Sequence, residues 1–418
     1  MTERLLHFIW RFQYYNSGEL CTTTGERLRV YAAGVLNTNQ GPDFREAKVW
    51  IDGALWAGTI ELHIRSSDWY QHRHADDKNY RNVILHVVWE HDARTPSAMP
   101  VLELRNRVSK ILLERYDSLM KMDRVIACQH AISTVPILSW NNWKERLLAE
   151  RLSRKSAMIQ SLLRQSNSHW EECFWWLLAR YFGMKVNALL FESVARSIPL
   201  PVLAKHKNQV LQLEALLFGQ AGLLEQPVED EYPRRLQTEY RFLRSKYKLK
   251  PVHAPVYFLR MRPGNFPTLR LAQLAALVSH SSHLFSKLKE SGSVQEFRKL
   301  FAVTASEYWH SHYRFDIVSA FRPKNTGQAM IDQIVINVLA PVLFAYGKEY
   351  GESQYIERAI RWLEETGAEN NSVTRGFENL GVSSKHAFDS QALLELRYQY
   401  CDCKRCLECA IGNAILKP

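Results

Sequence analysis

The fold of the N-terminal region is decided by residues 44–64, which read FREAKVWIDGALWAGTIELHI. The segments 44–51 and 54–64 are rich in β-branched and aromatic residues, and Asp52-Gly53 between them is a strong signal for a two-residue hairpin. We therefore predict two antiparallel strands. Asp43 before the first strand and Glu61 near the end of the second then become neighbours, because the open ends of a hairpin lie side by side.

The surrounding sequence extends this hairpin into a small sheet domain. An aromatic-rich helix is expected at 3–15, and further strands at 27–33, 82–90 and 101–104. From about residue 108 the apolar period changes to 3.6, which is typical of helices. The predicted fold class is α+β, a small N-terminal α/β domain with a mixed sheet followed by a large, mostly helical region. The predicted domains are 1–107, 108–230, 231–400 (helical and basic) and a cysteine-rich tail at 401–418.

The composition is that of a globular chain large enough for more than one core, with 418 residues of which 46% are hydrophobic. A net charge of +11 favours an anionic partner, with nucleic acid first, although a basic surface without such a partner has the same composition. Without an uninterrupted apolar run of spanning length or a signal-peptide pattern, we expect no membrane association and a cytoplasmic location.

Carboxylates and imidazoles gather at the ends of the predicted strands. Glu61 and His63 are two residues apart and so share one face of a strand, where Asp43 could join them around a Mg²⁺ or Mn²⁺ ion. The imidazole shifts the preference toward Mn²⁺ or Zn²⁺. The residues after this strand offer accessory groups, at Asp68, His72, His74 and His86. His74 with Asp76 and Asp77 could hold a second metal, or Arg73 a phosphate, and a polar loop remains the alternative.

Pro42-Asp43 followed by Glu61-Leu62-His63 resembles the motif of the PD-(D/E)xK nuclease superfamily. In that superfamily the two acids bind Mg²⁺ and a lysine orients or activates the attacking water. The resemblance implies a nuclease-like domain in which Asp43, Glu61 and His63 are catalytic. Glu3 or Glu19 would supply the extra acid that many members carry. His63 stands where the superfamily has lysine, and this departure leaves the catalytic role of His63 open.

A longer set of motifs resembles a bacterial family known only as a domain of unknown function. The motifs are Gly41-Pro42-Asp43-Phe44, Gly58-Thr59-Ile60-Glu61-Leu62-His63, Ser67-Asp68-Trp69, His72-Arg73-His74 and Val83-Ile84-Leu85-His86-Val87-Val88. Their order matches, and we expect the resemblance to extend to the C-terminal cysteines. It implies no activity.

Four of the seven cysteines lie within nine residues near the C-terminus, at Cys401, Cys403, Cys406 and Cys409. This density suits a metal better than local disulfides. The spacing is compatible with Zn²⁺ or with an iron–sulfur cluster, and Cys403 lies so close to Cys401 that both are not expected to reach one ion. The alternative is a set of reduced thiols on a short tail.

Residues 234–250 alternate basic and aromatic side chains. The cations expected to contact phosphates are Arg234, Arg235, Arg241, Arg244, Lys246 and Lys248, with Tyr240 and Tyr247 as stacking platforms for bases. An amphipathic helix with a solvated basic face is the alternative.

Together these features predict a nucleic-acid-binding protein, with a divalent-metal-dependent nuclease as the leading hypothesis. The alternatives are a non-catalytic nucleic-acid-binding protein with a degenerate nuclease fold, and a metal-bound scaffold for protein interactions.

Overall fold

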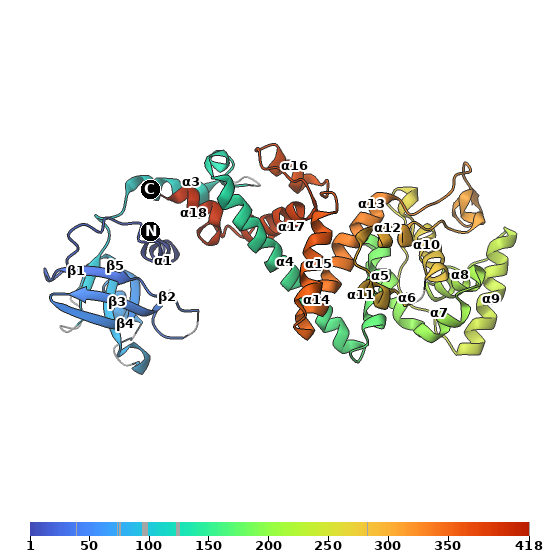
Figure 1. The fold of residues 1–418 in the computed structure, drawn as a ribbon, viewed down its shortest axis with the longest axis horizontal. Helices are drawn as coiled ribbons and strands as arrows, with labels where there is room; N and C mark the ends of the chain where they lie inside the picture. Colours follow the sequence, from blue (N-terminus) through green and yellow to red (C-terminus); the bar gives the residue numbers. More distant parts are fainter. Residues whose placement is uncertain are drawn as a thin grey trace. The chain divides into compact units, whose positions relative to one another are not determined.

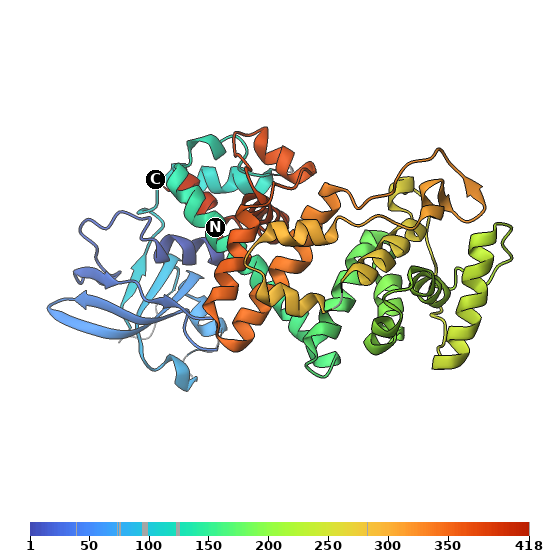
Figure 2. The ribbon, with the colours of Figure 1, turned by 45° about the vertical axis from the view of Figure 1, so that its right-hand side comes forward.

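The computed structural model describes residues 1–38, 40–72, 74, 77–93, 99–122, 126–281 and 283–417. The chain forms two compact units (Figures 1 and 2). The first unit contains Met1–Trp143 and Leu396–Pro418, and the second contains Lys144–Glu395. The expected α+β class is confirmed, with a mixed sheet at the N-terminus and a mostly helical remainder.

One six-stranded sheet forms the centre of the first unit. Its strands are β1 (Leu28–Ala32), β2 (Val35–Leu36), β3 (Phe44–Ile51), β4 (Ala54–Arg65), β5 (Val83–Glu90) and β6 (Val101–Glu103). Their order is β1-β3-β4-β5-β6, with β2 also paired to β3. The pairs β1–β3, β2–β3 and β3–β4 are antiparallel, whereas β4–β5 and β5–β6 are parallel.

The predicted hairpin between β3 and β4 is confirmed, with Ile51 paired to Ala54. Asp52 and Gly53 both have positive φ, at 43° and 96°, which is the conformation that a two-residue hairpin turn requires. The parallel pairing of β4 with β5 cannot be made by a tight turn and needs a crossover segment. That crossover contains the short helix α2 (Asp68–Gln71) and the 3₁₀ turn η2 (Lys78–Tyr80), and it brings polar residues back toward β4.

Helix α1 (Glu3–Arg11) packs against β4 and completes the core of this unit. Its apolar residues Leu5, Leu6 and Ile9 are buried in one cluster with sheet residues and with Leu416 near the C-terminus. The helix was expected to reach residue 15, but it ends at Arg11, followed by Gln13 in the left-handed conformation with φ of 51°.

The other elements of the first unit follow the sheet or return near the C-terminus. They are α3 (Lys110–Lys121), η3 (Ile132–Thr134), the π-helical turn η7 (Leu396–Cys401), η8 (Cys406–Glu408) and α18 (Ala410–Leu416). Helix α4 (Ile137–Gln165) begins in the first unit and continues into the second. The expected tail, residues 401–418, thus belongs to the same unit as the sheet.

The second unit consists almost entirely of helices. After α4 they are α5 (Trp170–Phe182), α6 (Met184–Ser197), α7 (Leu200–His206), α8 (Val210–Gln220), α9 (Glu231–Tyr247), η4 (Pro263–Asn265), α10 (Pro267–His280), α11 (Leu284–Glu290), α12 (Val294–Phe301), η5 (Glu307–His310), α13 (Gln328–Ile334), the π-helical η6 (Val335–Leu339), α14 (Ala340–Tyr350), α15 (Ser353–Glu364), α16 (Ser372–Glu378) and α17 (Ala387–Glu395). A small hairpin, β7 (His312–Arg314) with β8 (Ile317–Val318), is the other sheet of the described chain.

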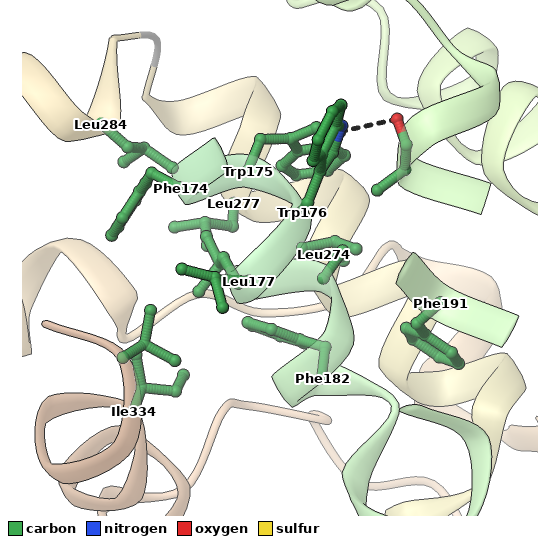
Figure 3. Packing of buried hydrophobic residues seen from close by; sticks show 14 of the residues in the cluster. Phe174, Trp175, Trp176, Leu177, Phe182, Phe191, Leu274, Leu277, Leu284 and Ile334 are labelled. Atoms are coloured by element: carbon green, nitrogen blue, oxygen red, sulfur yellow. Dashed lines mark hydrogen bonds between the residues drawn. The ribbon is translucent and has the colours of Figure 1, made fainter. Parts of the chain in front are cut away.

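Helix α5 runs through the core of the second unit, where Phe174, Leu177 and Phe182 pack among apolar residues of neighbouring helices (Figure 3). The continuous helical stretch Gln328–Tyr350 also belongs to this core. By length and composition it would pass as a membrane span, but 72% of its apolar window is buried within the structure. Such burial is what a core helix shows.

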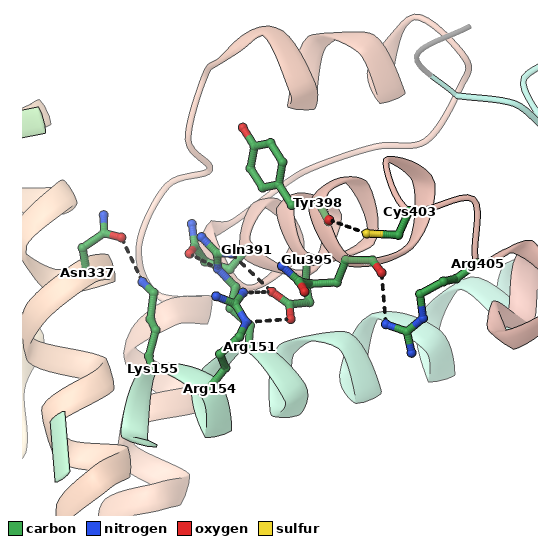
Figure 4. A network of polar contacts seen from close by, with 10 residues as sticks. Arg151, Arg154, Lys155, Asn337, Gln391, Glu395, Tyr398, Cys403 and Arg405 are labelled. Carbon is green, nitrogen blue, oxygen red and sulfur yellow. Dashed lines mark hydrogen bonds and ion pairs between the residues drawn. The ribbon is translucent and has the colours of Figure 1, made fainter. Parts of the chain in front are cut away.

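Charged side chains join α4 to α17 beside this core (Figure 4). Glu395, with a side chain only 3% exposed, accepts hydrogen bonds from both Arg151 and Arg154. Half-buried Lys155 donates to Asn337 Oδ1 at 2.9 Å, and loss of hydration lowers the pKa of its ammonium to about 7. These contacts satisfy the buried carboxylate, which would otherwise destabilise the helix pair.

Close contact between α8 and α9 depends on Gly219. A Cβ atom at this position would lie 2.2 Å from the Tyr240 ring, so we expect Gly219→Ala to lower the free energy of unfolding by about 1–3 kcal/mol. Gly376→Ala is the matched control, since it is also helical and has open space around its Cα. It should be neutral or raise the stability by about 0.5–1 kcal/mol. Denaturant unfolding of both variants tests this, and equal stabilities would contradict it.

Candidate metal centre

The central strand β4 carries polar side chains on one of its two faces. Ile60 and Leu62 point into the hydrophobic core, so Glu61 and His63 point to the opposite face. Both are buried all the same, with Glu61 5% and His63 1% exposed. The crossover between β4 and β5 covers this face. A buried carboxyl and a buried imidazole need partners, and the crossover supplies them.

Two histidines of the crossover lie against the pair on β4. His63, His72 and His74 place their ligand nitrogens within 4.8 Å of one another. His63 Nε2 lies 3.2 Å from His72 Nδ1. Glu61 Oε1 lies 3.5 Å from His63 Nε2 and 3.4 Å from His74 Nε2. Three imidazole nitrogens thus converge, and the Glu61 carboxyl lies within 3.5 Å of two of them.

The spacing of these atoms fits a metal ion. Ligands at about 2.05 Å from a tetrahedral ion are separated by about 3.3 Å, close to the observed distances. His74 Nε2 is buried and makes no hydrogen bond among the described residues; the Glu61 carboxyl lies 3.4 Å from it. A buried ring nitrogen that makes no hydrogen bond and lies beside other potential ligand atoms would be satisfied by binding a cation.

Residues that surround the three ligand histidines fix the orientation of His63. His63 Nδ1 and His86 Nε2 are 2.9 Å apart, so His86 Nε2 can accept a hydrogen bond from the N–H at Nδ1 of His63. Nε2 of His63 is then free to bind a cation. Trp69 packs against His74 and His86, with ring centroids 5.3 Å from each. Tyr80 stacks on His74 at 3.9 Å. The aromatic wall excludes water from one side of the cluster.

Asp43 adjoins Glu61 as the hairpin predicts. The Asp43 N–H donates to Glu61 Oε2 at 3.1 Å, and the Leu62 N–H donates to Asp43 Oδ2 at 3.0 Å. These reciprocal bonds hold the ends of β3 and β4 together. His7 of α1, a residue that the sequence did not single out, lies 3.2 Å from Asp43 Oδ2 through Nε2.

The cluster opens to solvent on the side of His7, Asp43 and His72. The Asp43 and His7 side chains are about one quarter exposed, and His72 is exposed. Glu3 stands one helical turn before His7 and its charge acts on Glu61, whereas Glu19 shows no such interaction among the described residues. The spacing of Glu3 and His7 on one helix face was the signal that could have revealed His7.

Burial sets the protonation of the cluster. It raises the pKa of Glu61 to about 8, and the charge of Asp43 adds to the rise. Burial also lowers the pKa of His63 to about 4 and that of His86 to about 3. The pKa of His74 is lowered for the same reason. At neutral pH, Glu61 therefore carries a proton while these imidazoles are neutral and can act as ligands.

The remaining predicted accessory residues have other positions. Asp68 lies in the first turn of α2 and accepts the Arg65 N–H at 2.9 Å, so it stabilises the start of the crossover and is not within the ligand group. Its charge still acts on His63. Asp77 accepts the Asn79 N–H at the start of η2. Arg73 and Asp76 lie outside the described residues.

The C-terminal cysteines occupy different environments. Cys401 and Cys406 are half-buried, and Cys409 is buried. Cys403 is exposed, and its Sγ lies 3.6 Å from the Tyr398 carbonyl oxygen (Figure 4). Among the described residues the cysteine sulfurs form no ligand group like that of His63, His72 and His74, so a metal at the C-terminal cysteines stays a prediction.

The six predicted phosphate-binding cations lie on or directly after α9, and all are exposed. Within the described part of the chain none of them forms an ion pair with an acidic side chain. The expected stacking by Tyr240 is wrong, because Tyr240 is buried and its hydroxyl accepts a hydrogen bond from Gln220. Tyr247 is half-buried against His206, and Phe242 is the exposed ring of this helix.

A mixed sheet with a buried histidine and carboxylate cluster thus defines the first unit. The chain belongs to the family described as Protein of unknown function (DUF2851), which matches residues 3–372. The matched residues include the whole histidine and carboxylate cluster and stop before the C-terminal cysteines. Comparisons with curated proteins and with solved structures gave no significant match.

Metal binding at this cluster should release about one proton per ion at pH 7, because Glu61 must ionise whereas His63 and His74 are already neutral. The release should disappear as the pH rises above 8. Mn²⁺ is the suitable probe, since thiolates bind it weakly. Calorimetric titration in buffers of different ionisation enthalpy measures the proton count.

Two variants sharpen this measurement. Glu61→Gln should bind Mn²⁺ more weakly and release no proton, while His130→Ala, which alters an exposed histidine outside the cluster, should match the wild type. Undiminished proton release from Glu61→Gln would place the ion elsewhere.

Proposed function

We propose that this protein is a divalent-metal-dependent hydrolase of phosphodiester bonds in nucleic acid. The observation that carries the proposal is the convergence of Glu61 with His63, His72 and His74 beside Asp43, at the solvent-accessible end of a hairpin. Such a cluster combines ligands for an ion with a flanking acid and a flanking imidazole, which are the groups that hydrolysis of a phosphodiester needs.

The ligand set favours Mn²⁺ or Zn²⁺ over Mg²⁺. Three imidazoles and one carboxylate suit transition metals, whereas Mg²⁺ prefers oxygen ligands and retains its waters. The sequence alone placed the ion between Asp43, Glu61 and His63. The contacts favour a centre on the three histidines with Glu61, because Asp43 Oδ2 already accepts from Leu62 and faces His7.

A metal ion bound there would lower the pKa of a coordinated water and stabilise charge on a phosphate oxygen. Asp43 orients His7 through the contact at 3.2 Å. His7 is partly exposed, so its ring can take a proton from a water or pass one to a leaving oxygen. His86 holds His63 in position, and the Trp69 wall keeps the ligands dry.

The likeness to the PD-(D/E)xK motif supports this function as well. Pro42-Asp43 directly precedes β3, Glu61-Leu62-His63 lies on β4, and Asp43 and Glu61 are in contact, as a shared site would require. The preceding helix contributes Glu3 and His7 near the acids. His63 replaces the superfamily's lysine and would serve as a ligand, so proton transfer falls to His7.

Nucleic acid is the proposed substrate because of the basic surface of α9. Six exposed cations without acidic partners among the described residues, with Phe242 58% exposed between them, can contact phosphates and stack on one base. The net charge of +11 also favours a polyanionic substrate.

One observation favours a second function, that of a non-catalytic nucleic-acid-binding protein with a degenerate nuclease fold. Glu61 and His63 are both deeply buried, and Asp43 is bonded to the main chain of β4. These contacts also stabilise a fold that does no chemistry, in which case α9 alone would carry the function.

Cleavage assays with single- and double-stranded DNA and RNA in Mn²⁺ separate the two functions. We expect metal-dependent cleavage by the wild type. Glu61→Gln should bind Mn²⁺ more weakly, and its cleavage activity should fall by at least about 10–100-fold as a result. His7→Gln should bind Mn²⁺ normally and lower kcat by about 100-fold, because only a proton-transfer group is removed. Asp43→Asn should resemble His7→Gln.

His130→Ala and Cys403→Ser are the controls, since both alter exposed residues outside the cluster. Wild-type protein that binds Mn²⁺ but cuts none of the four substrates would exclude the hydrolase and leave the binding function. Cleavage that survives Glu61→Gln unchanged would come from a different site or a contaminant.

Nucleic-acid binding by α9 has its own test. A triple variant, Arg241→Gln, Arg244→Gln and Lys248→Gln, should weaken binding to single-stranded DNA and RNA. It should also lower the slope of log K against log salt by about 0.7–0.9 for each phosphate that the variant no longer neutralises. Fluorescence anisotropy at several salt concentrations measures both quantities.

The control removes the same charge from exposed positions elsewhere on the helical unit, by Arg164→Gln, Lys205→Gln and Lys299→Gln. If both triple variants lose affinity and slope equally, the effect is one of net charge and α9 is not the binding surface.

A further inference from the structure

The face of the sheet that carries Glu61 continues along β4 toward the hairpin turn. Side chains alternate along a strand, so Leu55, Ala57 and Thr59 lie on the same face as Glu61. Helix α1 packs on the opposite, apolar face (Figure 1). Leu55 and Ala57 are exposed, and Thr59 is half-buried. One half of this face therefore holds the metal cluster, and the other half is open to solvent.

Residues paired across three strands form two rows on the open half. Arg29 of β1 and Leu55 of β4 both pair with Trp50 of β3. Lys48 of β3 pairs with Ala57 of β4 in the next row. Paired residues share a face, so two cations lie beside an aromatic ring and two aliphatic side chains. We call these five residues the open sheet face.

The charge of the open sheet face is positive. Arg29 and Lys48 are exposed, and neither forms an ion pair with an acidic side chain among the described residues. Trp50 between them is half-buried, so part of its ring is accessible. Unpaired cations can neutralise phosphates, and an accessible indole can stack on a base. The surface is therefore complementary to a nucleic acid whose bases are unpaired.

A hollow of about 470 Å³ lies on the sheet between the two rows and the metal cluster. It is lined by residues that include Lys48, Ala57, Thr59, Glu46 and Asn82. The Glu46 carboxylate can accept hydrogen bonds from a base edge, and the Asn82 amide can both donate and accept them. Thr59 stands two residues before Glu61 on β4, so the hollow adjoins the metal cluster.

The open sheet face has the length of a short piece of single strand. From Leu55 to Glu61 the strand β4 rises by about 20 Å, at about 3.4 Å per residue. A few nucleotides would cover this distance, with one base on Trp50 and another in the hollow. The bases of a duplex are stacked on one another and paired, so a duplex could contact the cations but not the ring or the hollow.

We propose that the open sheet face binds a single strand of nucleic acid and leads its backbone to the metal cluster. The inference rests on the proposed hydrolase function and names single-stranded nucleic acid as its substrate. Trp50 stacks on one base, the hollow receives another, and Arg29 and Lys48 neutralise phosphates. Helix α9 belongs to the other unit and is a separate contact for the same polyanion.

Binding measured without divalent metal tests this face independently of cleavage. Fluorescence anisotropy with labelled oligothymidine, and with a duplex of the same length, should show tighter binding of the single strand. Arg29→Gln with Lys48→Gln should lower the slope of log K against log salt by about 1.4, for two phosphates. Trp50→Leu should weaken binding by about 5–150-fold, because a stacked base is lost, and Trp50→Tyr should retain most of the affinity.

The controls lie in the same unit but on other surfaces. Trp56→Leu alters a ring that is 46% exposed and pairs with Val49 on the apolar face. Arg11→Gln with Lys110→Gln removes the same charge from exposed positions outside the sheet. Both controls should bind like the wild type. Equal losses in test and control variants, tighter binding of the duplex, or a wild type that binds no single strand would each overturn the inference.

Photocross-linking locates the contact even where a Trp50 variant folds poorly. Wild-type protein irradiated with an oligonucleotide that contains 5-iodouracil should cross-link within residues 44–59, as mass spectrometry of the digested protein would show. Cross-links confined to α9 or to other surfaces would overturn the inference.

Cleavage assays separate this inference from the hydrolase function. In Mn²⁺, Trp50→Leu and the Arg29/Lys48 double variant should raise KM for single-stranded substrate and leave kcat near the wild-type value. Cleavage with unchanged KM in both would keep the hydrolase and overturn the role of the open sheet face. Single-strand binding that these variants weaken, without any cleavage by the wild type, would exclude the hydrolase and keep the binding face.

Discussion

Burial of a carboxyl and an imidazole on the central strand β4 is the constraint on which the first unit depends. Glu61 and His63 lie between β3 and β5, where a sheet normally places apolar side chains. Two isolated charges there would cost more free energy than the strand pairing returns. The fold resolves this by surrounding them with His72, His74 and His86 and by suppressing the charges on Glu61 and His63.

Burying the cluster in its neutral form costs little free energy, and the same atoms are placed to bind a cation. A proton on Glu61 and the uncharged rings of His63 and His74 satisfy burial, and a divalent ion could replace that proton and bind the same atoms. The crossover makes this exchange possible because it carries His72 and His74 on a short segment imposed by parallel pairing. The same topological need that closes the sheet thus supplies two of the four candidate ligands.

The local parts of this fold could be predicted from the sequence. The Asp52-Gly53 hairpin and its register follow from turn chemistry, and register places Asp43 against Glu61. The 3.6-residue apolar period after residue 108 correctly indicates helices such as α5 and α12. Short helices are harder to predict: α7 begins at Leu200 between two prolines, because proline is well suited to a helix start.

Contacts between residues that are distant in the sequence could not be predicted, since a single sequence holds no record of them. His7 reaches Asp43 only through the packing of α1 on β4, and Tyr240 is buried only because Gly219 lets α9 approach α8. The dense cysteine pattern likewise gave no sign that Cys403 is exposed, with its sulfur against the Tyr398 carbonyl oxygen.

The chain returns to the first unit after a long excursion through the second. Lys144–Glu395 separates the two segments of the first unit, so the contacts of α18 with α3 form only after a very long loop has closed. Loop-closure entropy grows only slowly with length, so this long loop costs little more free energy than a much shorter one. Burial of Ile411, Ile415 and Leu416 of α18 offsets that cost, together with the hydrogen bonds from Arg115 to the carbonyl oxygens near the C-terminus.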